Sequence, residues 1–296
     1  MGKQVVMYGA SGFIGGGLAA RLAGDGFEVI GVSRKGDGDV AGVSRWAKPG
    51  DVDFKGCDVV VNLSGAPIDQ RWTEEKKREF HESRVGVTKD IVERISDLAE
   101  GDRPELLLNG SAVGIYGDRG DERLDESSSR GSGYLADLCA EWETAAGKAE
   151  PLGVRVVLFR TGVVLGKGGQ AYEKLFKVFK AGIGGRLGDG RQWMPWIHAD
   201  DLRSAMMFAI NDSKIFGPVN GTAPEPERNA DLTRKLAKAV GHRVFLPVPG
   251  FALKLVLGDF AGALLASQRA VPKTLELAGF RFRFRKLEDA LDDLTA

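Results

Sequence analysis

The sequence has few of the residues that build disulfide frameworks and metal sites. Its 296 residues include two cysteines, Cys57 and Cys139, and three histidines. Two cysteines are too few for a disulfide framework, and the histidines show no metal-ligand spacing with them. We therefore expect a reduced protein that holds no metal ion.

The sequence also lacks an excess of charge of either sign and an N-terminal secretory signal. Lysine and arginine total 41, as do aspartate and glutamate, so the formal net charge is zero. A chain without excess positive charge has no field that would hold a nucleic-acid backbone or an anionic membrane. No long apolar region with a cleavage site precedes the first strand. We expect a cytoplasmic protein with a small-molecule substrate and no nucleic-acid or membrane partner, and a homodimer stays open.

The chain has the composition of an ordinary globular protein. Hydrophobic residues make up 43% of it and charged residues 28%, which argues against long disorder or a fibrous repeat. This length suits one large α/β unit, or a nucleotide-binding domain with a smaller appended lobe.

Short runs rich in β-branched residues recur between segments of helical character. The runs are continuously apolar rather than alternating, which is typical of parallel strands covered by helices on both faces. The predicted strands are Gln4–Tyr8, Glu28–Ser33, Asp58–Leu63, Leu106–Ser111 and Arg155–Arg160. The predicted helices are Phe13–Ala23, Thr73–Leu98, Tyr134–Ala149 and Asp200–Ile210. Right-handed crossovers between them give an α/β fold with a Rossmann-type doubly wound parallel sheet.

A turn-rich break at residues 221–226 predicts a second unit. We expect residues 1–220 to form the NADP-binding Rossmann domain, with residues 169–200 contributing to the substrate cleft. Residues 221–296 are expected to form a smaller, mixed C-terminal substrate lobe.

Three segments of this lobe have recognisable patterns. Asn229–Val240 is predicted as a helix, and Phe251–Ala266 as a buried amphipathic helix, because it is too short and too interrupted to span a membrane. Phe280–Arg285 alternates phenylalanine with arginine, which favours a half-buried edge strand with solvated arginines over nucleic-acid binding.

The first predicted strand leads into Gly9-Ala10-Ser11-Gly12-Phe13-Ile14-Gly15, and a helix follows at once. In this context the first glycine permits a tight turn, the second lets backbone amides approach a pyrophosphate, and the third allows close packing of helix on strand. We expect Gly9, Ser11, Gly12, Phe13, Ile14 and Gly15 to bind a dinucleotide.

The end of the second strand normally selects between the two nicotinamide cofactors, because an acidic residue there repels a 2′-phosphate. This chain offers Ser33-Arg34-Lys35 instead, and a hydroxyl with cations can bind a phosphate dianion. Ser33 and Arg34 therefore favour NADP(H), and a solvated basic turn is the alternative. Leu63, Ser64, Gly65 and Ala66 are predicted to pass beneath the cofactor, although a plain strand-end turn explains them nearly as well.

Several motifs follow one another in the order of a known family. They are the glycine loop, Asn62 to Ala66, Ser111 to Gly117, Arg160 to Gly166, Gly188 to Leu202, and the tail from Leu246 to Leu291. The chain resembles an extended, atypical short-chain dehydrogenase/reductase of the NAD(P)-dependent epimerase-like subfamily that carries a C-terminal domain of unknown function. The resemblance implies this fold and an NADP(H)-type cofactor.

The resemblance also implies a catalytic tyrosine, a lysine four residues on that lowers the pKa of the phenol, and a serine or threonine that orients the substrate. Tyr134 and Ser111 are the candidates, but Leu138 stands where the lysine is expected, and Ala112 occupies the usual hydroxyl position. A packed aromatic and a strand-end hydroxyl are the alternatives. Tyr116 is expected to pack on the cofactor.

The Gly188 to Leu202 segment supplies the candidate substrate residues. Gln192, Trp193 and Trp196 are predicted to line a wall for a ring-bearing or sugar-like ligand, with core packing as an equal alternative. His198 faces the cleft or, as we favour, caps the following helix.

Two functions stay open. The first is an NADP(H)-dependent oxidoreductase, either a nucleotide-sugar epimerase or a carbonyl reductase, that works by hydride transfer. The second is a catalytically weak, NADP(H)-binding regulatory protein connected with cell division, which the missing lysine favours.

Overall fold

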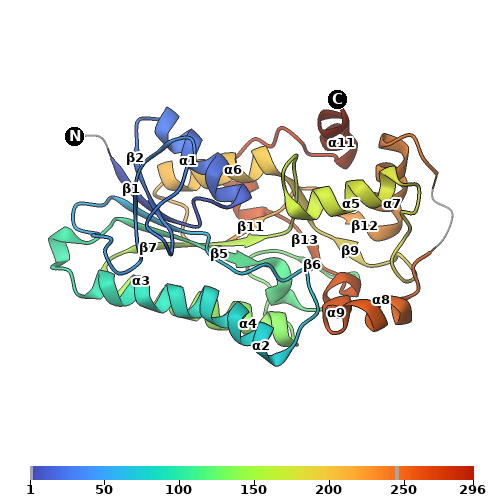
Figure 1. The fold of residues 1–296 in the computed structure, drawn as a ribbon, viewed down its shortest axis with the longest axis horizontal. Helices are drawn as coiled ribbons and strands as arrows, with labels where there is room; N and C mark the ends of the chain where they lie inside the picture. The colour runs from blue at the N-terminus through green and yellow to red at the C-terminus, as the bar shows by residue number, and fades with distance from the viewer. Residues whose placement is uncertain (1–2, 244–246) are drawn as a thin grey trace.

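The computed structural model describes residues 3–243 and 247–296 (Figure 1). Leu246, with which the predicted family tail begins, lies outside the described residues. The centre of the molecule is a seven-stranded sheet with the order β11-β7-β5-β4-β1-β2-β3, in which every pair of neighbours is parallel. Its strands are β1 (Gln4–Tyr8), β2 (Glu28–Val32), β3 (Val43–Ala47), β4 (Val59–Asn62), β5 (Leu106–Ala112), β7 (Arg155–Thr161) and β11 (Gly217–Gly221). The predicted Rossmann-type α/β fold is confirmed.

The direction of winding changes between β1 and β4. From β1 the chain builds outward to β2 and β3, and it then returns to add β4, β5, β7 and β11 on the other side. The loops that follow β1 and β4 therefore separate at the carboxyl edge of the sheet, and ligands of such sheets bind in the crevice that this leaves.

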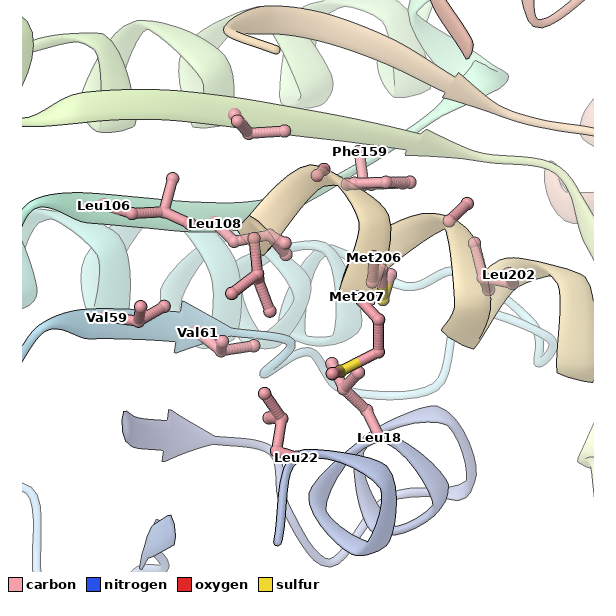
Figure 2. Packing of buried hydrophobic residues seen from close by; sticks show 14 of the residues in the cluster. Leu18, Leu22, Val59, Val61, Leu106, Leu108, Phe159, Leu202, Met206 and Met207 are labelled. Atoms are coloured by element: carbon pink, nitrogen blue, oxygen red, sulfur yellow. The ribbon is translucent and has the colours of Figure 1, made fainter. Parts of the chain in front are cut away.

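Helices cover both faces of the sheet (Figure 1). Helices α1 (Phe13–Gly24) and α6 (Ala199–Asn211) pack on one face, where Leu18, Leu22, Met206 and Met207 meet the side chains of β4 and β5 (Figure 2). The other face is covered by α3 (Val87–Ser96) and α4 (Tyr134–Gly147). Each fully buried aliphatic side chain contributes about 1.5–3 kcal/mol, so the apolar strands are stabilised from both sides.

The segment predicted as one helix over Thr73–Leu98 contains a change of helix type. Thr73 caps helix α2 (Glu74–His81) by accepting the amide of Lys76, and a π-helical turn, Glu82–Gly86, then leads into α3. A π-turn widens the helix locally and shifts which side chains face the sheet, and such turns are frequent at functional sites.

A second lobe is built around its own apolar core, which we call the second-lobe core. It contains Leu165, Tyr172, Phe179, Trp196, Ala223, Leu232, Leu236, Ala237, Phe284, Leu287, Ala290, Leu291 and Leu294. The helices that contribute to it are α5 (Gln170–Lys180), α7 (Asn229–Ala239) and α11 (Leu287–Thr295). Residues far apart in the sequence thus form one core.

Three short strand pairs lie outside the main sheet. Strand β8 (Val163–Leu165) pairs with β10 (Trp196–His198), β9 (Trp193–Met194) with β12 (Glu227–Arg228), and β6 (Arg123–Leu124) with β13 (Arg269–Ala270). Helix α10 (Lys273–Leu277) follows β13 and contacts β11 at the edge of the main sheet.

The prediction of a single buried helix over Phe251–Ala266 is wrong. The segment forms α8 (Gly250–Leu257) and α9 (Phe260–Leu265), and the chain turns between them at Gly258, whose φ is +60°. Phe251, Leu255 and Val256 are exposed by 79%, 77% and 69%. Within residues 3–243 and 247–296, no helix combines the length and the apolar character that crossing a bilayer requires.

The prediction of an edge strand over Phe280–Arg285 is wrong, because the segment pairs with no strand. The predicted alternation of buried phenylalanines and exposed arginines is present. Phe282 and Phe284 are buried, and the three arginines of the segment are exposed, but the segment joins no sheet. The carboxylate of Asp201 instead accepts the main-chain amides of Arg283 and Phe284, at 2.9 and 2.8 Å. A side chain of α6 thus accepts the main-chain hydrogen bonds that a neighbouring strand would otherwise accept.

Candidate functional site

The loop between β1 and α1 has the geometry of a phosphate-binding turn. Gly9 has a φ of +80°, and a side chain on it would lie 2.7 Å from the main chain of Leu63 in the loop after β4. A side chain on Gly15 would overlap the carbonyl group of Gly9. Gly12 donates its amide to that same carbonyl, at 3.0 Å. Close approach of helix, strand and loop therefore requires glycine at the first and third positions.

The N-terminus of α1 is open to a ligand. Gly12 occupies the N-cap position, no described side chain caps the helix, and its first turn has no acidic residue. Ser11 and Gly12 are exposed, while Phe13 and Ile14 are half-buried. Free amides and the helix dipole make such an end favourable for an anion.

The loop after β4 lies directly beside the glycine turn. Leu63 donates its amide to Tyr8, and Ser64 donates its hydroxyl to the side chain of Asn62. Gly65 is exposed, and Leu63, Ser64 and Ala66 are half-buried. These four predicted residues therefore form a surface at the carboxyl edge of the sheet, next to the glycines.

In the turn after β2, the serine predicted to bind the 2′-phosphate has a structural role, whereas the two basic residues are free to bind a ligand. The Ser33 hydroxyl accepts the amides of Gly36 and Asp37 and donates to the Asp37 carbonyl at 2.7 Å, so it builds the turn. Arg34 and Lys35 are exposed and form no ion pair with any residue that the structure describes. Two cations are therefore available at the end of β2.

A buried polar network beneath the β4 loop was not predicted. The Asn62 amide donates to Thr88 and to Asn109, at 2.9 and 2.7 Å, and the Trp142 indole donates to Thr88 at 2.9 Å. Asn62, Thr88 and Asn109 are fully buried. The network fixes the end of β4 against β5, α3 and α4. Two asparagines within buried strands were the signal in the sequence: Asn62 ends β4, Asn109 lies inside β5, and the two are register partners.

Ser111 is held by a buried ion pair. Its hydroxyl donates to Glu143 at 2.6 Å, and the same carboxylate accepts two hydrogen bonds from Arg160, both at 2.8 Å. Arg160 also donates to the hydroxyl of Tyr116, which in turn donates to Asn220. The network gives Tyr116 a packing position inside the protein, and burial raises the pKa of its phenol.

Tyr134 begins helix α4 and has a different hydrogen-bond partner from Ser111. Its hydroxyl donates to the carbonyl of Lys77 at 3.1 Å, and its ring packs on Trp72 with a centroid distance of 5.2 Å. Burial raises the pKa of the phenol, against the opposing charges of Arg84 and Lys77. The partner of Ser111, Glu143, is nine residues further along the helix, or about 13 Å at 1.5 Å per residue. The structure gives the two candidate catalytic side chains separate partners.

Leu138 is buried in an apolar cluster with Trp72, Phe80, Val85 and Trp142. An ammonium group would be poorly solvated there, so the surroundings of position 138 suit leucine and disfavour lysine.

The substrate candidates differ in exposure. Trp196 is fully buried in the second-lobe core and donates to the Glu225 carbonyl, and Gln192 is 6% exposed and donates to the Leu187 carbonyl. This geometry favours the core-packing alternative for both. Trp193 is half-buried, and the guanidinium carbons of Arg228 and Arg269 lie 4.5 and 4.6 Å from the centre of its ring.

His198 is 3% exposed and caps α6, because its Nδ1 accepts the amide of Asp200 at 3.1 Å. Its Nε2 has no hydrogen-bond partner in the described part of the chain, and the nearest carboxylate oxygen, of Asp293, is 3.5 Å away. Burial lowers the pKa of the imidazole. The structure thus favours the capping role over contact with a substrate. Among residues 3–243 and 247–296, no group of three or more histidine, cysteine, aspartate or glutamate side chains could hold a metal ion.

Comparison with known proteins gives consistent matches over almost the whole chain. The NAD dependent epimerase/dehydratase family matches residues 5–220, and a domain of unknown function, DUF1731, matches residues 248–294. The Arabidopsis thaliana epimerase family protein SDR39U1 homolog, named chloroplastic, is 38% identical over 97% of this chain and 85% of its own length.

Two solved structures are also similar. Human epimerase family protein SDR39U1, crystallised with NADPH, is 31% identical with a TM-score of 0.89 and covers 99% of both chains. A nucleoside-diphosphate sugar epimerase from Corynebacterium glutamicum is 34% identical with a TM-score of 0.80, over 100% of this chain and 58% of that one.

Proposed function

Because the chain belongs to the NAD dependent epimerase/dehydratase family, we propose that it binds NADP(H) at the Gly9–Gly15 turn and transfers hydride to or from a carbonyl or sugar-like substrate. The observation that carries this proposal is the close approach of Gly9 and Gly15 to neighbouring backbone, beside the open start of α1. The residues fit a dinucleotide, since the turn leaves amides and the exposed Ser11 for a pyrophosphate.

The preference for the phosphorylated cofactor rests on Arg34 and Lys35. Both cations are exposed, and neither is neutralised by a described carboxylate within ion-pair distance. Charge-assisted hydrogen bonds from a guanidinium to a phosphate are strong and directional. The NADPH in the human relative supports the same preference.

The bound nicotinamide would accept a hydride from a carbinol or return one to a carbonyl. In this proposal Tyr134 supplies or receives the proton at its phenol oxygen, and Trp193 contributes to the wall for the substrate. An epimerase returns the hydride to the other face of the substrate, whereas a reductase releases its product after one transfer. The name of the Corynebacterium relative supports a nucleotide-sugar substrate.

A catalytically weak, cofactor-binding regulatory protein is the second candidate, and three observations favour it. Leu138 replaces the expected lysine, the Ser111 hydroxyl is bonded to Glu143, and the Tyr134 hydroxyl is bonded to a main-chain carbonyl. A location in the cytoplasm, a link to cell division and a homodimer stay predictions.

Calorimetry with NADPH and NADH tests the cofactor assignment. We expect NADPH to bind at least about tenfold more tightly, equivalent to 1.4 kcal/mol, and Arg34→Ala to remove most of that difference. Arg45→Ala, in the exposed edge strand β3, is the matched control and should keep it. Equal affinities for the two cofactors in the wild-type protein would contradict the assignment.

The two candidate functions are separated by turnover. If the chain is an enzyme, Tyr134→Phe should lower substrate-dependent NADPH oxidation, across a panel of nucleotide sugars and small carbonyls, by at least about tenfold. A variant with full activity would exclude Tyr134 as the proton donor. No turnover by wild-type protein that binds NADPH would favour the regulatory candidate.

A further inference from the structure

One face of helix α4 presents Tyr134, Leu138 and Trp142, which are spaced four residues apart and therefore lie in a row. All three side chains belong to one apolar cluster. The row holds a candidate proton donor at its start and no cation of its own. A positive charge near Tyr134 must therefore come from a facing element.

The facing element is the helix that contains the π-turn. At one end of the row, Tyr134 bonds the carbonyl of Lys77 in α2, and at the other end Trp142 bonds Thr88 in α3. Arg84 lies between these two contacts, within the π-turn, and its guanidinium carbon is 5.5 Å from the centre of the Trp142 ring.

Arg84 also touches the loop after β4. Its Nη2 donates to the carbonyl of Ala66 at 3.0 Å, and a side chain on Gly65 would lie 3.0 Å from its guanidinium carbon. Gly65 is exposed, so the guanidinium borders a surface that a ligand can reach. The loop is held to the same turn by Ser83, whose hydroxyl accepts the amide of Ala66 at 2.9 Å.

The order of the strands indicates which half of a dinucleotide would lie here. The end of β2 is the proposed site of the adenosine 2′-phosphate, and the turn after β1 is the proposed site of the pyrophosphate. Strand β4 is on the opposite side of β1 from β2. The nicotinamide half of a cofactor bound across this edge therefore extends toward the β4 loop and Arg84.

The charge of Arg84 is not compensated by any carboxylate among the residues that the structure describes. Its hydrogen bonds go to the carbonyls of Ala66 and Phe80 and to the Ser83 hydroxyl, and no described carboxylate pairs with it. Burial lowers the pKa of the guanidinium. A half-buried cation without an anion is costly, and the phosphate on the nicotinamide side of the pyrophosphate, the one anionic group of that half of the cofactor, would offset that cost.

Lys77 is the other cation near Tyr134, but it is already paired. Its ammonium lies 3.0 Å from Glu74 and 3.3 Å from Asp259. The charged groups that act on the phenol are Arg84 and Lys77, which favour its ionised form, and Glu74 and Glu141, which oppose it. Of these two cations, Arg84 is thus the one that pairs with no described carboxylate and that contacts the β4 loop.

We propose that Arg84 replaces the missing lysine: it binds the nicotinamide half of NADP(H) beside Gly65 and Ala66, and it supplies positive charge to the Tyr134 phenol. This inference rests on the proposed cofactor site. It assigns a cofactor-binding and electrostatic role to a helix that carries none of the residues of the Tyr-x-x-x-Lys pattern.

The test compares Arg84→Met, Arg84→Lys and the control Arg94→Met, whose arginine lies in α3 and pairs with Asp90. NADPH affinity is measured by calorimetry, and the local charge is measured by titrating 3-nitrotyrosine placed at position 134. Arg84→Met should weaken NADPH binding at least tenfold and raise the pKa of the nitrophenol. Arg84→Lys should restore most of both effects, and Arg94→Met should change neither.

Circular dichroism checks that each variant folds. If Arg84→Met does not fold, Arg84→Gln is used instead, because an amide can keep the hydrogen bond to Ala66. Unchanged NADPH affinity or an unchanged nitrophenol titration overturns the inference while leaving the cofactor site intact. If wild-type protein binds no NADPH, the proposed function fails and the inference fails with it.

Discussion

Gly15 shows how one residue can fix the distance between a helix and a turn. It lies in the first turn of α1, where alanine would normally be the better helix former, yet a Cβ there would overlap the carbonyl of Gly9. We expect Gly15→Ala to lower the free energy of unfolding by about 1–3 kcal/mol, as overpacking does, and to weaken NADPH binding. Urea unfolding and calorimetry measure the two effects.

Gly24→Ala is the matched control, because it makes the same change at the last residue of the same helix, where a Cβ would meet no atom within 4 Å. It should leave both quantities nearly unchanged. Equal effects of the two substitutions would show that backbone freedom, rather than close approach, explains the glycine at position 15.

Asp125 provides a pH-dependent contact between the segment after β6 and helix α10. A hydrogen bond from Lys273, with help from Ser127, lowers the pKa of Asp125 from 3.8 to about 2. Because the carboxyl has a lower pKa in the folded protein than in the unfolded chain, it stabilises the fold at every pH above the unfolded-state pKa. This stabilisation is lost as the pH falls from about 4 toward 2. In Lys273→Met the pKa should return toward 3.8, and the stability at pH 7 should fall by less than about 1 kcal/mol.

Carboxyl NMR titration of Asp125 and unfolding at several pH values measure this prediction. Lys148→Met, which removes an exposed lysine outside any described ion pair, is the control. An unaltered Asp125 titration in Lys273→Met would contradict it.

The candidate site could be predicted at the residue level only where its signal is local in the sequence. Glycine spacing identified the turn, and the basic pair after β2 identified two free cations, because both signals are local. Arg84 could not be found in this way, since its position depends on a π-turn that no residue pattern announces. Trp196 and His198 have residue types common in binding sites, but the three-dimensional packing buried them.

Among the elements, the five predicted strands are present with ends shifted by at most one residue, because each is a continuous apolar run in the buried part of the sheet. The two edge strands, β3 and β11, were not predicted. An edge strand pairs on one side only and tolerates polar residues, glycine and proline, and β11 reads Gly-Pro-Val-Asn-Gly. Its apolar signal is therefore too weak to recognise.

Helix α8 has one buried face and one exposed face, and substitutions on the two faces test its orientation. Leu253 is 9% exposed and Leu255 is 77% exposed, although they are two residues apart in the same helix. We expect Leu253→Ser to lower the free energy of unfolding by about 2–4 kcal/mol, through lost burial and a buried hydroxyl, and Leu255→Ser to change it by less than about 0.5 kcal/mol. Chemical unfolding of both variants provides the measurement, and similar losses would mean that α8 is rotated from its described orientation.

For the whole molecule, Asp201 ties the C-terminal segment to α6. It is 2% exposed, and Asp201→Ala would leave the amides of Arg283 and Phe284 without their acceptor. Each buried unsatisfied group costs about 1–3 kcal/mol. We expect faster hydrogen exchange in residues 280–296, measured by mass spectrometry, with little change in the central sheet.

Asp200→Ala is the neighbouring control, since Asp200 pairs with Arg21 and Arg203 at the protein surface and forms no hydrogen bond or ion pair with residues 280–296 in the described structure. It should leave exchange in residues 280–296 unchanged. If Asp201→Ala also leaves hydrogen exchange in residues 280–296 unchanged, the Asp201 hydrogen bonds do not hold the segment, and its buried phenylalanines do.

The composition of the second-lobe core also sets an order of events during synthesis. Residues of α5 and α7 cannot complete this core until Leu287, Leu291 and Leu294 of α11 have been made. At 5–20 residues per second, the ribosome needs roughly 3–11 s to proceed from the end of α7 to the end of α11. During that interval the apolar faces of α5 and α7 lack their last partner, so the growing chain presents there a temporary binding surface for chaperones.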